Sequence, residues 1–209
     1  MTTTTTSRHA TKSTGPRSGT SYRAAAVASE ILAPWIFAAV MPPIVGALTT
    51  DPWWHGLLIG LMVTTLTAVI PYGVIQVRVR SGQYSDRHLV RREDRPKFLT
   101  LVVGLTVLAL VLVRVLDGSW VLQVFVVLVL VIAALGALVS RWWKISMHTL
   151  VMAASLATLI SLDERFTPLT ALLPLVIWAR LRLRVHSPAQ LLTGTAAGTV
   201  LGIAAMLLT

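Results

Sequence analysis

The sequence contains no cysteine, which excludes disulfide bonds, thiolate metal sites and cysteine nucleophiles. Charge is also scarce: Asp, Glu, Lys and Arg make up 12% of the 209 residues, against roughly 25% in ordinary globular domains. Neither a P-loop nor a GxGxxG fingerprint is present, so these nucleotide-binding motifs are excluded as well. Hydrophobic residues, by contrast, make up 55% of the chain, and this content excludes disorder for most of its length.

Seven stretches are about as long and apolar as a membrane-spanning helix, which needs about 20 mostly apolar residues. They are residues 26–48, 54–77, 98–116, 120–139, 145–162, 168–185 and 188–208. Pro42-Pro43 interrupts the first stretch, and Asp117-Gly118-Ser119 is expected to form a tight hairpin between the third and the fourth. The sequence therefore predicts an all-α, polytopic transmembrane helix bundle of six or seven membrane helices over residues 25–209. The basic, Thr/Ser-rich residues 1–24 are predicted to be a disordered tail.

The charges are unevenly distributed along the chain. The net charge is +10, from 18 Lys and Arg against 8 Asp and Glu. If successive helices alternate in direction, the tail and residues 78–97, 141–144 and 180–186 share one side of the membrane, which then carries 16 of the 18 cations. By the positive-inside rule this side is cytoplasmic. The sequence thus predicts a multi-pass plasma-membrane protein with its N-terminus inside and its C-terminus outside.

Three of the five histidines fall on this basic side, each beside a cationic group: His88, His148 and His186. Guanidinium groups bind phosphoryl oxygens, and imidazoles serve as nucleophile and proton donor near neutral pH, so the pattern favours a phosphate site. The alternative is that the cations only set the topology and bind anionic headgroups. A metal site built from the three histidines is electrostatically poor among so many cations, so no metal and no cofactor are predicted. Nucleic acid is not an expected partner, because the basic loops lack interleaved aromatic residues.

Three short segments on the basic side carry a resemblance to a known family. They are His88-Leu-Val-Arg-Arg-Glu-Asp-Arg95-Pro96, Ile145-Ser146-Met147-His148, and Ala179-Arg180 followed by His186 and Gln190. In this order they resemble the motifs Lys-x6-Arg-Pro, Pro-Ser-Gly-His and Ser-Arg-x5-His-x3-Asp of the type 2 phosphatidic acid phosphatase superfamily, which also includes the vanadium haloperoxidases. The resemblance covers about residues 84–202 and is in particular to divergent, actinobacterial-type members.

The resemblance implies a role for each matching residue. His186 would be the nucleophile that forms a phosphohistidine, His148 would protonate the leaving group, and Gln190 would stand where the family has an aspartate. The residues expected to hold the phosphate are Arg95, Lys144, Ser146, Arg180 and His88. Those expected to support them or to line the entrance are Asp86, Arg92, Arg182 and Arg184. For Arg182 and Arg184, snorkelling at the end of a helix is the alternative.

Two departures from the family pattern concern the site directly. Gln190 lies four residues after His186, which is the same face if the segment is helical. Its carbonyl can accept an Nδ1–H bond from His186 but adds no negative charge, so slower turnover is expected. The first motif has His88 where the family has Lys, and Lys144 is the expected replacement. Asp86 and His88 either pair with each other or contact the substrate.

Gly194, Gly198 and Gly202 are spaced by four in the last apolar stretch. This spacing predicts a face that packs closely against another helix, either within the chain, which is favoured, or in a homodimer.

Together these patterns predict a metal-independent integral membrane phosphatase. It would hydrolyse a phosphomonoester or diphosphate of a lipid or polyprenyl carrier through a phosphohistidine intermediate, with its active site on the cytoplasmic side. Two alternatives use the same scaffold. One is a lipid-phosphate-binding, transport or assembly protein that does not hydrolyse its ligand, and the other is an enzyme that consumes prenyl diphosphates.

Overall fold

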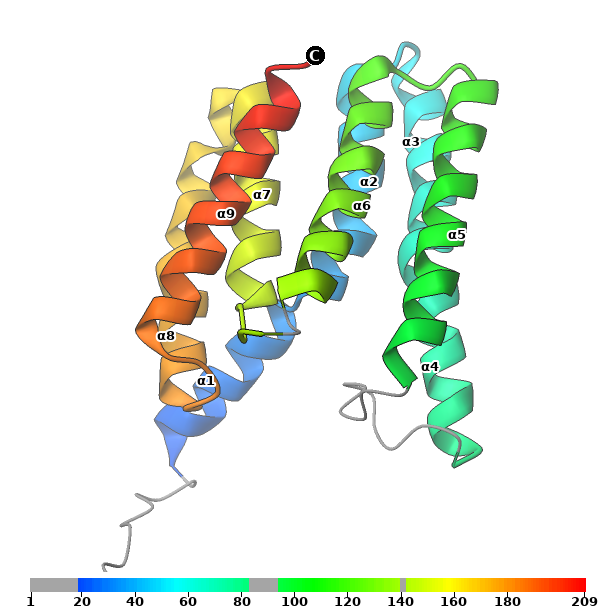
Figure 1. The fold of residues 1–209 in the computed structure, drawn as a ribbon. Coiled ribbons are helices and arrows are strands. Elements are labelled where there is room, and N and C mark those ends of the chain that lie inside the picture. The colour runs from blue at the N-terminus through cyan, green and yellow to red at the C-terminus, as the bar shows by residue number, and fades with distance from the viewer. Residues whose placement is uncertain (1–18, 83–93, 140–141) are drawn as a thin grey trace, which may run out of the picture.

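The computed structural model describes residues 19–82, 94–139 and 142–209, and for residues 94–99 the backbone alone. The described residues form helices and no strand (Figure 1), so the predicted all-α helical bundle is confirmed. The elements in chain order are α1 (Thr20–Ile31), α2 (Pro34–Thr49), α3 (Trp53–Thr64), the π-helix η1 (Thr65–Val69), α4 (Ile70–Arg80), α5 (Asp94–Val115), α6 (Trp120–Val139), α7 (Met147–Leu162), the 3-10 helix η2 (Glu164–Ala171), α8 (Leu172–Arg182) and α9 (Pro188–Met206).

Four helical stretches among the described residues are long and apolar enough to cross a membrane. They are Thr20–Thr49, Trp53–Arg80, Trp120–Val139 and Pro188–Met206. Thr100–Val115 and Met147–Leu162 are shorter apolar helices. Large apolar side chains such as Val111, Leu192 and Val200 are exposed on the outside of the bundle. Such a surface is compatible with a membrane protein, because exposed apolar area on this scale marks contact with lipid or with another protein.

The first apolar stretch bends at a different proline from the predicted one. Pro42 and Pro43 lie inside α2 and do not end it, whereas the chain leaves the helix between α1 and α2, just before Pro34. Ala33 is extended there (φ −75°, ψ 150°), a conformation that the ring of the following proline favours.

A hydrogen bond from the neighbouring helix compensates for Pro43. Pro43 has no N–H to donate to the carbonyl of Ala39, four residues earlier. Thr64 of α3 supplies the missing donor, with its Oγ1 2.7 Å from that carbonyl oxygen. Gly60 of α3 lies against the backbone of both prolines, where any Cβ would overlap it. The helix therefore continues through two prolines because α3 is packed directly against them.

The predicted tail is shorter than expected. Residues 20–24 belong to α1, and α1 packs along α8. Ser21 accepts hydrogen bonds from Nε and Nη2 of Arg182, at 3.1 and 3.0 Å. This contact across 161 residues was not visible in the sequence, and it extends the helical region to Thr20. Residues 1–18 of the predicted tail lie outside the described residues.

The helices form two groups that are connected by α2 and α6 (Figure 1). Helices α1, α7, α8 and α9 make up one group, and α3, α4 and α5 make up the other. The most extensive pairings are α7 with α9 and α2 with α3. The largest buried cluster includes Val45, Val63, Val126 and Leu150. The core thus lies where α2, α3, α6 and α7 meet.

The glycine face of the last helix is occupied within the chain. Gly194, Gly198 and Gly202 are buried, and a Cβ at each of them would overlap residues of the connection into α7 or of α7 itself. At Gly202 the overlapping atom is the carbonyl oxygen of Ala154, 2.7 Å from the position of the Cβ. The expectation that this face packs inside the molecule is confirmed.

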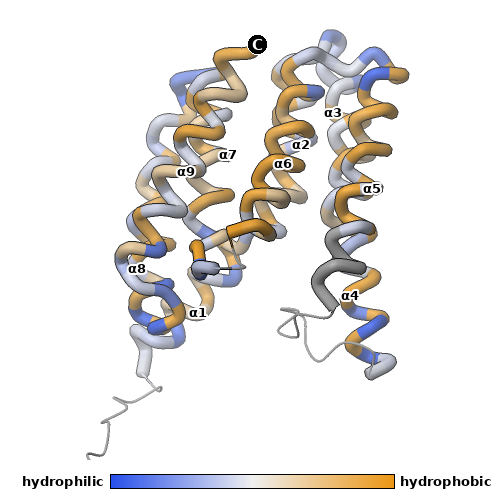
Figure 2. The backbone as a smooth tube through the Cα atoms, in the orientation of Figure 1, coloured by the Kyte–Doolittle hydropathy of each residue, from blue (hydrophilic) through white to orange (hydrophobic). Residues whose placement is uncertain are grey.

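Hydrophilic residues gather at the two ends of the bundle (Figure 2). The lower end carries the start of α1, the end of α4 and the connections α6–α7 and α8–α9 (Figure 1). The upper end carries the α2–α3, α5–α6 and α7–η2 connections, which contain Asp51, Asp117 and Asp163. The expected hairpin before α6 is present, with Asp117 at φ 54° and the Gly118 N–H donating to the carbonyl of Val113. The described basic segments therefore lie at one end, as the alternation of helix directions predicted.

Candidate functional site

The second and third sequence motifs lie side by side at the lower end of the bundle. The segment 144–149 leads into α7, and the segment 185–191 leads into α9. Three hydrogen bonds join the two segments: from Lys144 Nζ to the Val185 carbonyl (2.8 Å), from the Ser146 N–H to the Gln190 carbonyl (3.4 Å), and from Thr149 Oγ1 to the Leu191 carbonyl (3.0 Å). His148, in the first turn of α7, and His186, in the loop before α9, are therefore on neighbouring segments.

Arg180 is the central cation of this region. It is half-buried near the end of α8, and its Nε–H donates to Nδ1 of His186 at 3.4 Å. Its Nη1 donates to Oγ of Ser29 at 2.7 Å, and Ser29 is only 5% exposed. Glu30, the next residue on α1, lies close enough for a favourable charge interaction with Arg180. Arg180, His186 and Ser29 thus form one connected polar group from three parts of the chain.

Sequence reasoning missed the contribution of α1. Ser29 and Glu30 are the two polar residues that interrupt the apolar run from Ala24 to Val40. A carboxylate is costly in a membrane-spanning segment and is expected to have a partner. That signal was present in the sequence, but it did not indicate which of the 18 cations would be the partner.

His186 is neutral at physiological pH. Burial first, and then the positive charges of Arg180 and Lys144, lower the pKa of its imidazole to about 4. Because Arg180 donates to Nδ1, the neutral ring carries its proton on Nε2. In this arrangement the Nε2–H can donate a hydrogen bond to an anion, and the lone pair on Nδ1 accepts the hydrogen bond from Arg180.

Two residues that the sequence analysis assigned to the site have a capping role. The carbonyl Oε1 of Gln190 accepts the backbone N–H of Ser187 at 3.1 Å, and Ser187 Oγ accepts the Gln190 N–H at 3.3 Å, which is a capping box at the start of α9. The expected bond from His186 Nδ1 to Gln190 is therefore not the one found. Ser146 is fully buried, and its Oγ accepts the Thr149 N–H as the N-cap of α7. Both side chains thus accept N–H groups at the starts of helices, where these donors have no partner within the helix.

The ends of the helices add positive potential to the same region. Both α7 and α9 begin here, and the N-terminus of a helix carries a partial positive charge that favours anions. Lys144 is exposed at this point, half-buried His148 lies in the first turn of α7, and Arg180 is half-buried beside them. The positive charges and the helix ends favour an anion at this end of the bundle.

The remaining arginines of α8 point to a different role. Arg182 is held by Ser21 of α1, as described above. Arg184 is exposed and adopts a left-handed conformation (φ 54°) just after the helix, where the chain turns toward His186. The described hydrogen bonds of Arg182 go to Ser21 and not to His186.

The first sequence motif is only partly described. Asp86, His88 and Arg92 lie outside the described residues. For Arg95 the backbone is described, in the first turn of α5, a helix of the other group (Figure 1). The described contacts therefore bring together the second and third motifs and do not bring α5 to them.

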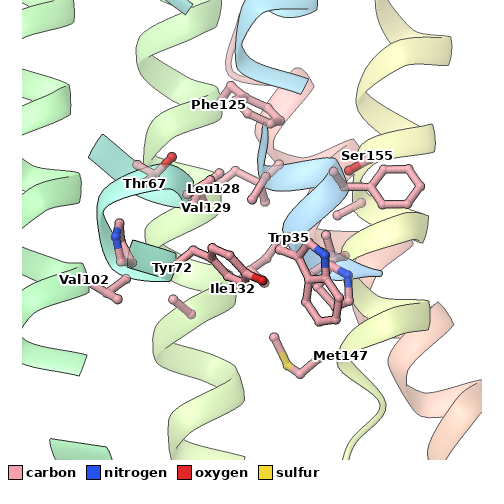
Figure 3. A pocket seen from close by; sticks show the side chains of 18 of the residues that line it. Trp35, Thr67, Tyr72, Val102, Phe125, Leu128, Val129, Ile132, Met147 and Ser155 are labelled. Carbon is pink, nitrogen blue, oxygen red and sulfur yellow. The ribbon is translucent and has the colours of Figure 1, made fainter. Parts of the chain in front are cut away.

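A cavity of about 490 Å³ lies between the two groups of helices. Its walls are mainly apolar and come from α2, α4, α6 and α7, with η1 closing one side (Figure 3). Glu30 and Met147 also line it, and they are the chain neighbours of Ser29 and His148. The cavity thus extends from the middle of the bundle to the residues beside the polar group.

Within the described ranges, no three His, Asp or Glu side chains come together as a metal site would require. The imidazole of His186 instead lies near the cations Arg180 and Lys144, and Glu30 interacts with Arg180.

No family model matches this chain, and no curated protein or solved structure matches it either.

Proposed function

We propose that the chain is an integral membrane phosphatase that hydrolyses a phosphomonoester or diphosphate of a lipid or polyprenyl carrier at the cytoplasmic face of the plasma membrane. One observation carries the proposal: Arg180, His186 and Lys144 meet at the basic end of an apolar helix bundle, on segments that also carry His148. Cations that flank a neutral imidazole form a site for an anion, and the apolar helices around it suit a ligand with a hydrocarbon chain.

The reaction would proceed in two steps through His186. The Nε2 lone pair attacks phosphorus, a P–N bond forms, and the P–O bond to the lipid breaks as the leaving oxygen takes a proton from His148. Water then attacks phosphorus, the P–N bond breaks with its electron pair returning to Nε2, and a proton of the water passes to His148. Arg180 and Lys144 would stabilise the charge on the phosphoryl oxygens throughout. The products are inorganic phosphate and the dephosphorylated lipid, or the lipid monophosphate when the substrate is a diphosphate.

This chemistry requires Arg180 to change partner. With Arg180 on Nδ1, the neutral imidazole carries its proton on Nε2, which is the atom that must attack. A bound phosphoryl group offers the guanidinium a stronger, doubly hydrogen-bonded partner. We expect Arg180 to turn to the phosphate when substrate binds, which leaves Nδ1 to take the proton and Nε2 to attack.

The experiment is phosphate release by the purified protein from a panel of lipid phosphates in nanodiscs. His186→Ala is expected to lower kcat by about a thousandfold or more, because it removes the nucleophile. His55→Ala, a histidine at the opposite end of the bundle, is the matched control and is expected to leave kcat unchanged. Acid-quenched phosphorylation of the protein, present in wild type and absent in His186→Ala, would identify the intermediate.

A second candidate is a protein that binds a lipid phosphate without hydrolysing it. One observation favours it: His186 Nδ1 accepts from Arg180, and Gln190 is engaged in the capping box of α9. If the purified protein binds polyprenyl phosphate but releases no phosphate from any lipid, the phosphatase is excluded and this second candidate stands. If His186→Ala releases as much phosphate as wild type, His186 is not the nucleophile and the proposed reaction is excluded.

A further inference from the structure

The cavity between the two helix groups has the chemistry of a hydrocarbon site. Aromatic and aliphatic side chains make up most of its wall, among them Trp35, Phe37, Tyr72, Phe125 and Ile132. Its volume of about 490 Å³ falls in the range of roughly 300–1,000 Å³ that is typical of small-molecule sites. An apolar cavity of this size in a helix bundle gains free energy from filling with hydrocarbon, because its walls lack dispersion partners when it is empty.

The cavity follows α6 toward the basic end of the molecule. In Figure 3, Phe125 lies at the upper end of the pocket and Met147 at the lower end, with Tyr72 and Ile132 between them. The lining residues on α6 run from Phe125 to Ala133, which is about 12 Å at the rise of an α-helix. The lower end is bordered by Glu30 and Met147, directly next to Ser29 and His148 in the chain.

We propose that this cavity binds the hydrocarbon chain of a single-chain phosphorylated lipid, a polyprenyl phosphate, with the phosphate held by Arg180, Lys144 and His186. This inference rests on the proposed function for the identity of the headgroup. Charge complementarity favours a phosphorylated lipid, because Glu30, which lines the cavity, interacts with Arg180 of the cationic group. A diacyl lipid phosphate, which has the same headgroup chemistry, is the competing occupant.

Glu30 has a defined place in this arrangement. Its carboxylate lies near Arg180 at the border of the cavity, where the phosphate of a bound lipid would come closest to it. The phosphate then replaces Glu30 as the anionic partner of Arg180. The like charges of carboxylate and phosphate oppose each other, so Glu30 lowers the affinity for every phosphorylated lipid, and burial of the chain in the cavity offsets part of this cost.

The experiment uses a polyprenyl phosphate with a photoreactive group in its chain, in nanodiscs that contain the full chain. Crosslinks are expected on residues that line the cavity on α2, α4 and α6. Ala133→Phe fills the cavity from α6 and is expected to reduce crosslinking and to raise KM for the long-chain substrate about tenfold or more. Ala38→Phe fills the cavity from α2 and is expected to have the same effect, which makes a folding defect of the first variant an insufficient explanation.

Two controls make the result specific. Val127 lies on the same helix but lines a second apolar pocket, together with Leu110 and Trp120. Val127→Phe is therefore expected to leave crosslinking and KM unchanged. A phosphate ester with a single isoprene unit is expected to have the same kcat/KM in Ala133→Phe as in wild type, because it does not reach the cavity.

The outcomes separate the inference from the proposed function. If phosphate is released but Ala133→Phe and Ala38→Phe leave long-chain KM and crosslinking unchanged, the cavity is not the chain site and the phosphatase stands. If crosslinks map to the cavity but no phosphate is released, the chain site stands and the phosphatase does not. Equal crosslinking of the cavity by a photoreactive diacyl phosphate would overturn the assignment to a single-chain lipid.

Discussion

At the scale of single residues, the site is organised by one guanidinium. Arg180 donates to an imidazole on one side and to the hydroxyl of Ser29 on the other, and each contact fixes part of its planar fork. A lysine at this position would offer a compact ammonium group without that geometry. The pairing also determines the state of His186, because an N–H that points at Nδ1 selects one tautomer and opposes protonation.

The lowered pKa of His186 predicts a pH dependence of stability. In the unfolded chain a histidine titrates near about 6.5, whereas in the folded protein the pKa of His186 is about 4, first because of burial and then because of Arg180 and Lys144. Between these values the unfolded chain binds a proton that the folded chain does not, so stability falls as the pH is lowered from 6.5 to 4. His186→Gln is expected to flatten this part of the curve.

The measurement is the thermal unfolding midpoint of the detergent-solubilised protein between pH 4 and pH 8. His55→Gln, which removes an imidazole at the far end of the bundle, is the control and should keep the wild-type profile. A His186→Gln profile that is parallel to wild type throughout would show that this imidazole is not the origin of the pH dependence.

The sequence predicted which residue types gather at the site but not which atoms they use. The spacing of the motifs placed His148, Arg180 and His186 at one end of the bundle, and the contacts between 144–149 and 185–191 agree with that. The side chain of Gln190 was assigned to His186 from helical spacing alone. Spacing does not show that Ser187 caps a new helix and that its N–H donates to the side chain of Gln190.

At the scale of elements, the passage of α2 through two prolines depends on α3. The carbonyl of Ala39 has lost its helical donor to Pro43 and receives the hydroxyl of Thr64 instead. Thr64 is 8% exposed, so water is a poor substitute for that hydroxyl. The two helices therefore share one hydrogen-bond ladder at this point.

This sharing predicts a coupled effect of two substitutions. Thr64→Val is expected to destabilise the protein by about 1 kcal/mol, because it leaves a buried carbonyl without a donor. In a Pro43→Ala background the same substitution should cost close to nothing, since position 43 regains the N–H that Ala39 needs. The double-mutant cycle is measured by thermal unfolding in detergent.

Thr65→Val is the matched control for this cycle. Thr65 Oγ1 also donates to a carbonyl, that of Leu61, but the same carbonyl already accepts the backbone N–H of Thr65. Its cost should be small in both backgrounds. Equal costs of Thr64→Val with and without Pro43 would show that the hydroxyl does not replace the missing donor.

The apolar stretches of the sequence predicted the helices well because length and hydropathy are local properties. The fourth stretch, 120–139, coincides with α6, and the last one matches α9 within two residues at its end. The bend at Pro34 and the start of α1 were missed for different reasons. Which of the three prolines interrupts the helix depends on contacts with α3. Whether residues 20–24 are helical depends on contacts with α8. Both partners are distant in the sequence.

At the scale of the whole molecule, the two ends of the bundle are expected to face opposite sides of the membrane. The chain has no cysteine, so a single introduced thiol can be labelled without background. Ser81→Cys, just after α4 at the basic end, is expected to be protected from an impermeant reagent added to intact cells. Thr50→Cys, before α3 at the other end, is expected to react.

Permeabilised cells provide the control for this prediction, because both thiols should then react equally. Labelling of Ser81→Cys from outside intact cells would invert the orientation and place the candidate site on the outer face. The predicted orientation rests on the basic residues at the lower end and on the acidic residues of the upper connections. An arginine that binds a phosphate has a functional reason to be there, so it is weaker evidence for the orientation than an arginine without such a role.

The π-helix η1 has a further consequence for the molecule as a whole. In an α-helix each residue turns the chain by about 100°, and a π-turn accommodates one residue more than an α-turn. Thr67 and Ala68 of η1 and Pro71, Tyr72 and Ile75 beyond it all line the cavity. The rotation of α4 about its axis relative to α3 thus depends on the number of residues in η1, not on the identity of any side chain. Over evolution, insertion or deletion of one residue in η1 would turn the lining residues of α4 toward the cavity or away from it. Substitutions at the same positions do not reproduce this change.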